Sequence, residues 1–290
     1  MTAAIKELFR FGDIRVVAGP DFPEPYHCPC NLFTLASLSD ADIATALERR
    51  ISLQTLYDQH ARRAAGTEDT IGRAGETAVR TAVERSNRFI IGHAWGDVKD
   101  QRIVGASDGL IYDPRLPVNQ AGILVEIKNW RRWIYHDTQE LWKHIRNAYA
   151  MDTVPLFFAR RISKHTFDYV FKRVGGLGVE MRTQFAPPDL EDILASARDA
   201  DGLDYFDLRF TTDPGPRFCQ RVSKLASNVE SARRRMDLAL PIVEPFLDRL
   251  ADEGVRGNAR ATVYWGLQAA LNAANIDPLS LNLGAPLNLE

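Results

Sequence analysis

Two acidic residues and a lysine near the middle of the chain have the types and the spacing that metal-dependent hydrolysis requires. Glu126 and Lys128 lie within the apolar run 123–130, and Asp108 precedes Glu126 by 18 residues. Because side chains on a strand alternate between its two faces, an extended run places Glu126 and Lys128 on the same face. Charged groups in so apolar a strand are costly unless they are paired or bind a metal ion. This segment is therefore the first candidate site.

The chemistry that these groups support is phosphodiester hydrolysis. Two carboxylates and a backbone carbonyl are the hard oxygen ligands that Mg²⁺ or Mn²⁺ prefers, and such an ion keeps several waters. The ion lowers the pKa of a bound water and shields a phosphate, while a neighbouring lysine orients or deprotonates that water or stabilises charge on the phosphate. The three side chains must therefore converge in the folded chain.

The elements that would position these side chains alternate between helix and strand. In chain order, hydrophobic periodicity predicts helix 70–88, strands 89–91, 102–112 and 122–130, helix 137–151, strand 154–159, helix 164–174 and strand 179–182. This order predicts an α/β architecture with a mixed central sheet and helices on both sides. A turn-rich stretch, 113–120, separates the second and third strands, and their antiparallel pairing would bring Asp108 beside Glu126.

With these residues in this order, the sequence resembles the PD-(D/E)XK nuclease superfamily, which also includes archaeal Holliday-junction resolvases. The resemblance covers residues 72–182, with Ser107 in place of the proline that usually precedes the strand aspartate. It implies a restriction-endonuclease-like mixed central sheet flanked by helices. It also implies a metal-dependent nuclease whose products carry 5'-phosphate and 3'-hydroxyl ends.

The resemblance assigns a role to each residue of the candidate site. Asp108, Glu126 and the backbone carbonyl of Ile127 correspond to the ligands of Mg²⁺ or Mn²⁺, and Lys128 corresponds to the catalytic lysine. Glu76, in the predicted helix 70–88, corresponds to a helical glutamate that assists the metal or its waters. The expected catalytic residues are therefore Asp108, Glu126, Lys128 and Glu76.

A basic and aromatic segment after Lys128 predicts a polyanionic partner. Residues 131–173 hold nine Lys or Arg residues against four acids, and Trp130 and Trp133 lie at the start of this segment. Cations beside the site would neutralise phosphates, and indole rings could stack on unpaired bases. Gln139 corresponds to a glutamine that many relatives carry on the following helix. The expected nucleic-acid-binding residues are Trp130, Arg131, Arg132, Gln139 and Lys143.

Composition limits the function classes further. The 290 residues include 36 Lys and Arg against 38 Asp and Glu, so affinity for nucleic acid must come from a local surface. No stretch approaches about 18 consecutive apolar residues, which argues against a membrane partner. The three cysteines cannot all pair, and a reducing cytoplasm is the expected location. We expect a partly helical N-terminal region at 1–68, a nuclease-like core at 69–186 and a C-terminal helical region at 187–290.

Two other classes of function stay open at this stage. The nuclease-like core could serve as a catalytically silent nucleic-acid-binding or assembly subunit, or as the scaffold of a structural or regulatory protein. The simplest alternative for the central residues is an edge strand with an exposed Glu126–Lys128 pair, but this does not explain Asp108 or Glu76. DNA is the favoured substrate, and a role in bacterial defence, restriction or repair is the favoured context. The resemblance also implies a homodimer.

Overall fold

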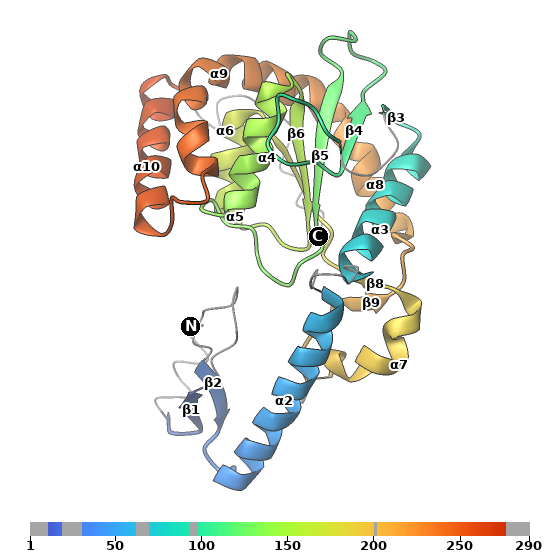
Figure 1. Cartoon of the computed structure of the whole chain (residues 1–290), viewed down its shortest axis with the longest axis vertical. Coiled ribbons are helices and arrows are strands. Elements are labelled where there is room, and N and C mark those ends of the chain that lie inside the picture. The colour runs from blue at the N-terminus through green and yellow to red at the C-terminus, as the bar shows by residue number, and fades with distance from the viewer. Residues whose placement is uncertain (1–10, 19–30, 62–69, 93–97, 200–201, 277–290) are drawn as a thin grey trace. The chain divides into compact units, whose positions relative to one another are not determined.

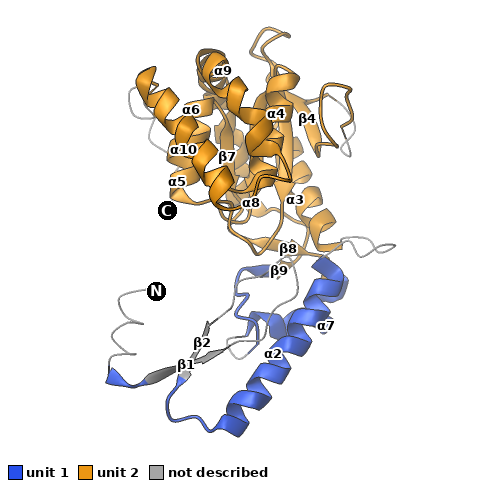
Figure 2. Ribbon diagram, turned by 60° about the vertical axis from the view of Figure 1, so that its left-hand side comes forward, with its two compact units in different colours: residues 1–69, 189–208 blue, residues 70–188, 209–290 orange. Residues whose placement is uncertain are grey.

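The computed structural model of the chain describes residues 11–18, 31–61, 70–92, 98–199 and 202–276. Contacts between residues divide the chain into two units, 1–69 with 189–208 and 70–188 with 209–290 (Figure 2). This division differs from the three predicted regions, because the C-terminal helices group with the central sheet and the segment 189–208 groups with the N-terminal residues.

A five-stranded mixed sheet forms the centre of the second unit. Its strands, in spatial order, are β3 (Ile90–Ile91), β4 (Gly109–Tyr112), β5 (Gly122–Lys128), β6 (Val154–Ala159) and β7 (Leu177–Glu180). The pairs β3–β4 and β4–β5 are antiparallel, whereas β5–β6 and β6–β7 are parallel. The predicted α/β architecture with a mixed central sheet is therefore confirmed.

Helices cover both faces of this sheet (Figure 1). The helices of the unit are α3 (Thr70–Ser86), α4 (Gln139–Ala150), α5 (Lys164–Thr166), α6 (Lys172–Val174), α8 (Gly215–Leu225), α9 (Val229–Ala251) and α10 (Asn258–Ala273). Val125 and Ile127 pack with α3 and α8 on one face, whereas Phe157 and Ala159 pack with α4, α9 and α10 on the other. The two faces of the sheet are thus both buried, as a near-continuous apolar run in β5 and β6 requires.

Two short helical turns and a small second sheet accompany these elements. A π-helical turn, η1 (Phe167–Phe171), links α5 to α6, and a 3₁₀ turn, η4 (Ala226–Asn228), links α8 to α9. The strands β8 (Gln184–Ala186) and β9 (Leu208–Phe210) form a separate two-stranded sheet.

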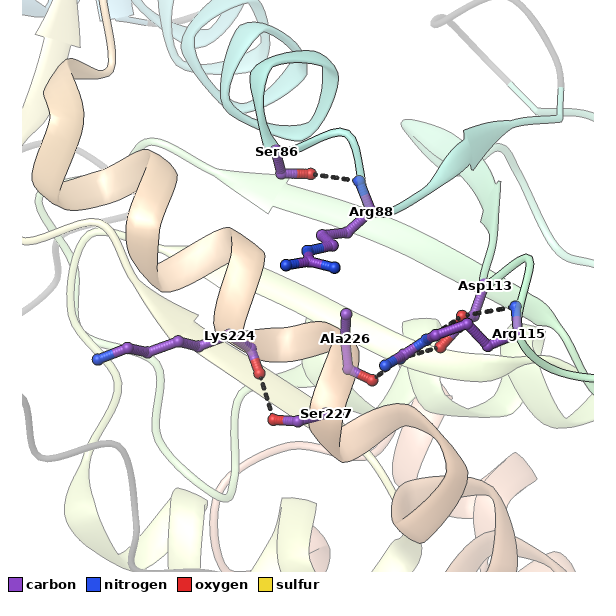
Figure 3. A network of polar contacts seen from close by, with 7 residues as sticks. All are labelled: Ser86, Arg88, Asp113, Arg115, Lys224, Ala226 and Ser227. Carbon is purple, nitrogen blue, oxygen red and sulfur yellow. Dashed lines mark hydrogen bonds and ion pairs between the residues drawn. The ribbon is translucent and has the colours of Figure 1, made fainter.

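A polar network joins the turn after β4 to η4 (Figure 3). The carboxylate of Asp113, which is fully buried, accepts hydrogen bonds from the Arg115 backbone N–H at 3.0 Å and from Arg115 Nε at 2.8 Å. Arg115 Nη2 also donates to the carbonyl oxygen of Ala226. The turn that connects β4 to β5 is therefore held by a residue more than 100 positions later in the chain.

Two predicted elements differ from the observed ones. Strand 102–112 is shorter, because the Asp100 carboxylate accepts hydrogen bonds from the Arg102 backbone and guanidinium and forms a turn there. The predicted helix 164–174 is divided by the π-helical turn η1 into α5 and α6. Helix α9 is continuous through both Pro241 and Pro245. Both prolines lie on the exposed side of α9, where water can bond the carbonyl groups that a proline leaves unpaired.

The first unit contains a hairpin and a long helix. Its elements are β1 (Ile14–Ala18), β2 (Asn31–Leu35), α2 (Asp40–Ala61) and α7 (Glu191–Leu194), with 3₁₀ turns η2 (Pro188–Leu190) and η3 (Ala195–Arg198) beside α7. Ser39 caps the N-terminus of α2, since its hydroxyl accepts a hydrogen bond from the Asp42 N–H at 3.2 Å. Tyr57 packs edge to face on Tyr205 at 5.1 Å and is buried. None of the described helices is long and apolar enough to cross a membrane.

Candidate active site

Three of the predicted catalytic side chains lie together at the end of the β4–β5 ladder. Lys128 Nζ donates a hydrogen bond to Glu126 Oε1, so the two side chains form an ion pair on one face of β5. The Asp108 carboxylate accepts from the Ile127 N–H at 2.6 Å, and the Asp108 N–H donates to the Val125 carbonyl at 3.1 Å. Asp108 therefore sits directly beside the Glu-x-Lys segment, although the two are 18 residues apart in the chain.

The electrostatics of this group keep Lys128 charged. Its side chain is 17% exposed and that of Glu126 is 11% exposed. Burial by itself lowers the pKa of Lys128, but the charges of Glu126, Asp108 and Glu140 outweigh this effect and raise it above its usual value. Lys128 is therefore an ammonium at neutral pH, which suits it to stabilise or orient negative groups rather than to remove a proton.

The sequence alone did not predict that a buried histidine lies beside Glu126. His144, on α4, has its Nδ1 atom 3.9 Å from Glu126 Oε2 and is 2% exposed. Neither ring nitrogen has a hydrogen-bond partner within the described residues. Burial and the charge of Lys128 lower the pKa of His144 to about 3, against weak opposing backbone interactions, so the ring is neutral. The sequence signal was a polar residue on the apolar face of α4, between Leu141 and Ala148.

Asn129 fixes the end of β5 against α3. Its side-chain amide donates to the carbonyls of Ile71 and Phe185, each at 2.7 Å, and its Oδ1 accepts from the Phe185 N–H at 3.1 Å. Gly75 lies so close that a Cβ at that position would overlap the Asn129 side chain. Glu76, the predicted helical acid, follows this contact directly and is exposed to solvent. The structure thus places Glu76 on a helix that packs at the end of β5.

The segment after Lys128 carries aromatic and basic groups. Lys128 Nζ lies 5.2 Å from the ring centroid of Trp130, a cation–π distance. Arg160 holds this segment in place, because its guanidinium donates to the carbonyl oxygens of Trp130 and Arg131 at 3.2 and 2.7 Å. Arg132 is exposed.

Two aromatic rings of the same segment face solvent together. The rings of Trp133 and Tyr135 are stacked, with centroids 6.4 Å apart and planes inclined by 17°. Their exposed fractions are 44% and 46%. Exposed stacked rings provide a flat apolar surface on which an unpaired base can stack.

Two predicted binding residues on α4 point to different neighbours. Gln139 Nε2 donates to the Ala251 carbonyl at 3.3 Å, which directs this side chain to the end of α9. The Lys143 ammonium lies beside Gly105, since a Cβ on that glycine would be 3.3 Å from Lys143 Nζ. Lys143 therefore adjoins the loop that leads into Asp108, whereas Gln139 joins two helices.

The candidate site offers oxygen groups of the kind that a divalent metal ion prefers, but it offers few of them. Asp108 and Glu126 supply two carboxylates, and the Ile127 carbonyl lies between Glu126 and Lys128 in the chain, all hard oxygen groups of the kind that Mg²⁺ or Mn²⁺ prefers. However, one Glu126 oxygen is bonded to Lys128. In the described part of the chain, no group of three or more His, Cys, Asp or Glu side chains is placed to hold a metal ion. The metal site stays a prediction.

Comparisons of the chain with protein-family models, with curated proteins and with solved structures give no match. The resemblance to a nuclease superfamily therefore depends on the residues themselves and on the order of the elements that carry them.

Proposed function

We propose that the protein is a divalent-metal-dependent nuclease with a restriction-endonuclease-like core, and that Asp108, Glu126 and Lys128 carry its chemistry. The observation that supports this most is the Glu126–Lys128 ion pair, largely buried in an apolar strand and adjacent to Asp108. A buried ion pair contributes little to stability compared with well-packed apolar residues. Its presence in β5 is better explained by function than by folding.

The residues of this chain would divide the work of phosphodiester hydrolysis. Hydrolysis forms a bond from a water oxygen to phosphorus and breaks the bond to the 3' oxygen, which leaves a 5'-phosphate and a 3'-hydroxyl. Asp108, Glu126 and the Ile127 carbonyl would hold Mg²⁺ or Mn²⁺, which when bound acidifies a water and shields the phosphate. The Lys128 ammonium stabilises the charge that develops on the phosphate oxygens. Glu76 would assist the metal or its waters.

The surroundings of the site support a nucleic-acid substrate, with DNA favoured. Arg131, Arg132 and Lys143 would neutralise backbone phosphates, and the exposed Trp133–Tyr135 stack could accept an unpaired base. A homodimer that cuts both strands belongs to the same proposal, as does a role in bacterial defence, restriction or repair.

One observation favours a second candidate, a catalytically silent nucleic-acid-binding or assembly subunit. Glu126 Oε1 is already bonded to Lys128, and two acidic side chains are few for a metal site. In this alternative, Asp108 and Glu126 would only balance the charge of Lys128.

A cleavage assay with matched variants tests the proposal. The purified protein is incubated with plasmid, linear duplex, single-stranded DNA and RNA in Mg²⁺, Mn²⁺ or EDTA. We expect cleavage that requires the metal, and we expect Glu126→Ala and Lys128→Ala each to reduce it by at least about 100-fold, since one electrostatic group contributes about 10²–10³ to a rate. Circular dichroism checks that the variants are folded.

Glu84→Ala provides the control, because Glu84 forms an exposed ion pair with Arg80 on α3. This variant should cleave like the unmodified protein. Full activity of Glu126→Ala would refute the assignment of the site, and binding without cleavage under every metal condition would select the silent alternative.

A further inference from the structure

A pocket lies between the segment 164–174 and α10, and it shares no residue with the candidate active site. Its volume is about 280 Å³. Its lining residues are His165, Tyr169, Arg173, Trp265, Gln268 and Asn272. This volume is just below the range of about 300–1,000 Å³ that is usual for small-molecule pockets. The pocket therefore has room for at most one small ligand.

Arg173 gives this pocket a positive charge that no described carboxylate balances. The residue is 7% exposed, and its Nη1 donates to the neutral amide of Gln268 at 2.9 Å. Its Nε has no hydrogen-bond partner, and no carboxylate pairs with it, within the residues that the structure describes. The neighbouring acid, Asp168, pairs with Lys172 instead. A buried guanidinium without an acidic partner is unfavourable, so a bound anion would supply the missing charge.

Gln268 holds Arg173 in a fixed position. While its Oε1 accepts from Arg173, its Nε2 donates to the Tyr169 carbonyl at 3.0 Å, within the π-helical turn η1. The Arg173 guanidinium also lies 5.4 Å from the Tyr169 ring centroid. Single π-helical turns occur frequently at functional sites. The cation is thus oriented before any ligand arrives.

Aromatic rings form the remaining wall of the pocket. Trp265 is 56% exposed, and its ring lies 6.0 Å from that of His165. His165 in turn stacks on Tyr169 at 4.6 Å and hydrogen bonds to the Tyr264 hydroxyl at 2.6 Å. An exposed indole braced by other rings offers a face to a flat heterocycle.

We propose that this pocket binds a nucleotide, with its phosphate on Arg173, its base against Trp265 and the base edge toward the Asn272 amide. The phosphate would balance the charge of Arg173, which has no acidic partner among the described residues, and the base would stack on the exposed Trp265 ring. Both halves of the ligand would therefore have a partner. The unit could be a free nucleotide or the terminal nucleotide of a nucleic-acid strand. This inference does not depend on the nuclease assignment, since it concerns binding at a separate set of residues.

Calorimetric titration of the full-length protein tests the proposal. The probes are adenosine 5'-monophosphate, a 5'-phosphorylated tetranucleotide, its 5'-hydroxyl counterpart, adenosine and inorganic phosphate, all in EDTA so that no cleavage occurs. We expect saturable binding of the monophosphate, the phosphorylated tetranucleotide or both, and weaker binding of the other three probes. Binding of only one of the first two probes identifies the source of the nucleotide.

Two variants locate the site. Trp265→Ala and Arg173→Gln should each weaken binding about tenfold or more, since one stacked base or one charge-assisted hydrogen bond contributes that much. Leu238→Ala removes an exposed apolar side chain on α9 outside the pocket and should bind normally. If Arg173→Gln fails to fold, Trp265→Ala decides, because its side chain is largely exposed.

Three outcomes would overturn the proposal. The first is no saturable binding of either nucleotide probe at millimolar concentration. The second is unchanged binding by Trp265→Ala. The third is inorganic phosphate binding as tightly as the monophosphate, which would remove any role for the base.

Discussion

At the scale of single residues, the candidate site combines groups that carry charge with one that does not. Lys128 stays an ammonium because three carboxylates surround it, whereas His144 stays neutral because it is buried beside that ammonium. Glu126 lies between them and contacts both. Lys128 is therefore the positive charge of this group, and His144 is an uncharged neighbour.

Asp113 allows a prediction about pH at the same scale. Burial by itself raises the pKa of Asp113, but the hydrogen bonds and charge of Arg115 outweigh it and hold the pKa below its usual value of 3.8. In the unfolded chain Asp113 regains that usual value. Its contribution to stability is therefore complete above about pH 4 and is lost as the pH falls further, through the folded-state pKa.

We expect Asp113→Asn to lower the free energy of unfolding by about 1–3 kcal/mol at pH 7, since it weakens a buried charge-assisted hydrogen bond. Urea unfolding at pH 7, 5, 4 and 3 should show this difference shrinking below pH 4. A difference that stays constant across this range would contradict the pKa assignment.

At the scale of elements, packing between α3 and β5 positions the site, and this contact was not visible in the sequence. Hydrophobic periodicity predicted both elements, and strand 154–159 has the predicted bounds. The role of Asn129 could not be predicted, because its partners Ile71 and Phe185 are more than 50 residues away. The sequence also did not indicate that His144 faces Glu126, because the periodicity of α4 does not fix which of its buried residues lies beside a given residue of β5.

Gly75 provides a prediction for this contact. We expect Gly75→Ala to destabilise the protein by about 1–3 kcal/mol, because its Cβ would overlap the Asn129 side chain and overpacking has costs of this size. The matched control is Gly266→Ala in α10, where the Cβ would lie 3.4 Å from Phe246 Cε1, an ordinary contact.

Gly266→Ala should be neutral or stabilising by up to about 1 kcal/mol, owing to the higher helix propensity of alanine. Urea unfolding of both variants checks the pair. If the two substitutions changed the free energy of unfolding equally, the packing of Gly75 against Asn129 would be looser than the structure shows.

At the scale of the whole molecule, charge and architecture have separate consequences. The formal net charge of −2 gives no overall attraction to a polyanion, so nucleic-acid binding would depend on a few local cations near the site. The C-terminal helices belong to the same unit as the sheet, and α9 and α10 bury its second face. These helices are thus part of the core that supports the candidate site.

Salt dependence tests the local-cation argument. Affinity for a duplex oligonucleotide, measured by fluorescence anisotropy in EDTA at 50–200 mM KCl, should fall linearly on logarithmic axes. Arg132→Gln should reduce the slope by about 0.9, the value for one lost phosphate contact. Arg256→Gln, an exposed arginine before α10, should leave the slope unchanged. An unchanged slope for Arg132→Gln would remove this residue from the binding surface.

The sequence by itself determined the alternation of helices and strands, the mixed sheet and the shared face of Glu126 and Lys128. These follow from periodicity and side-chain alternation, which are properties of short segments. Only the tertiary structure decided that His144 lies beside Glu126, that Asn129 joins β5 to α3, and that Arg173 lines a pocket with aromatic walls. These contacts depend on how whole faces of the helices and the sheet pack together, which no short segment of the sequence fixes.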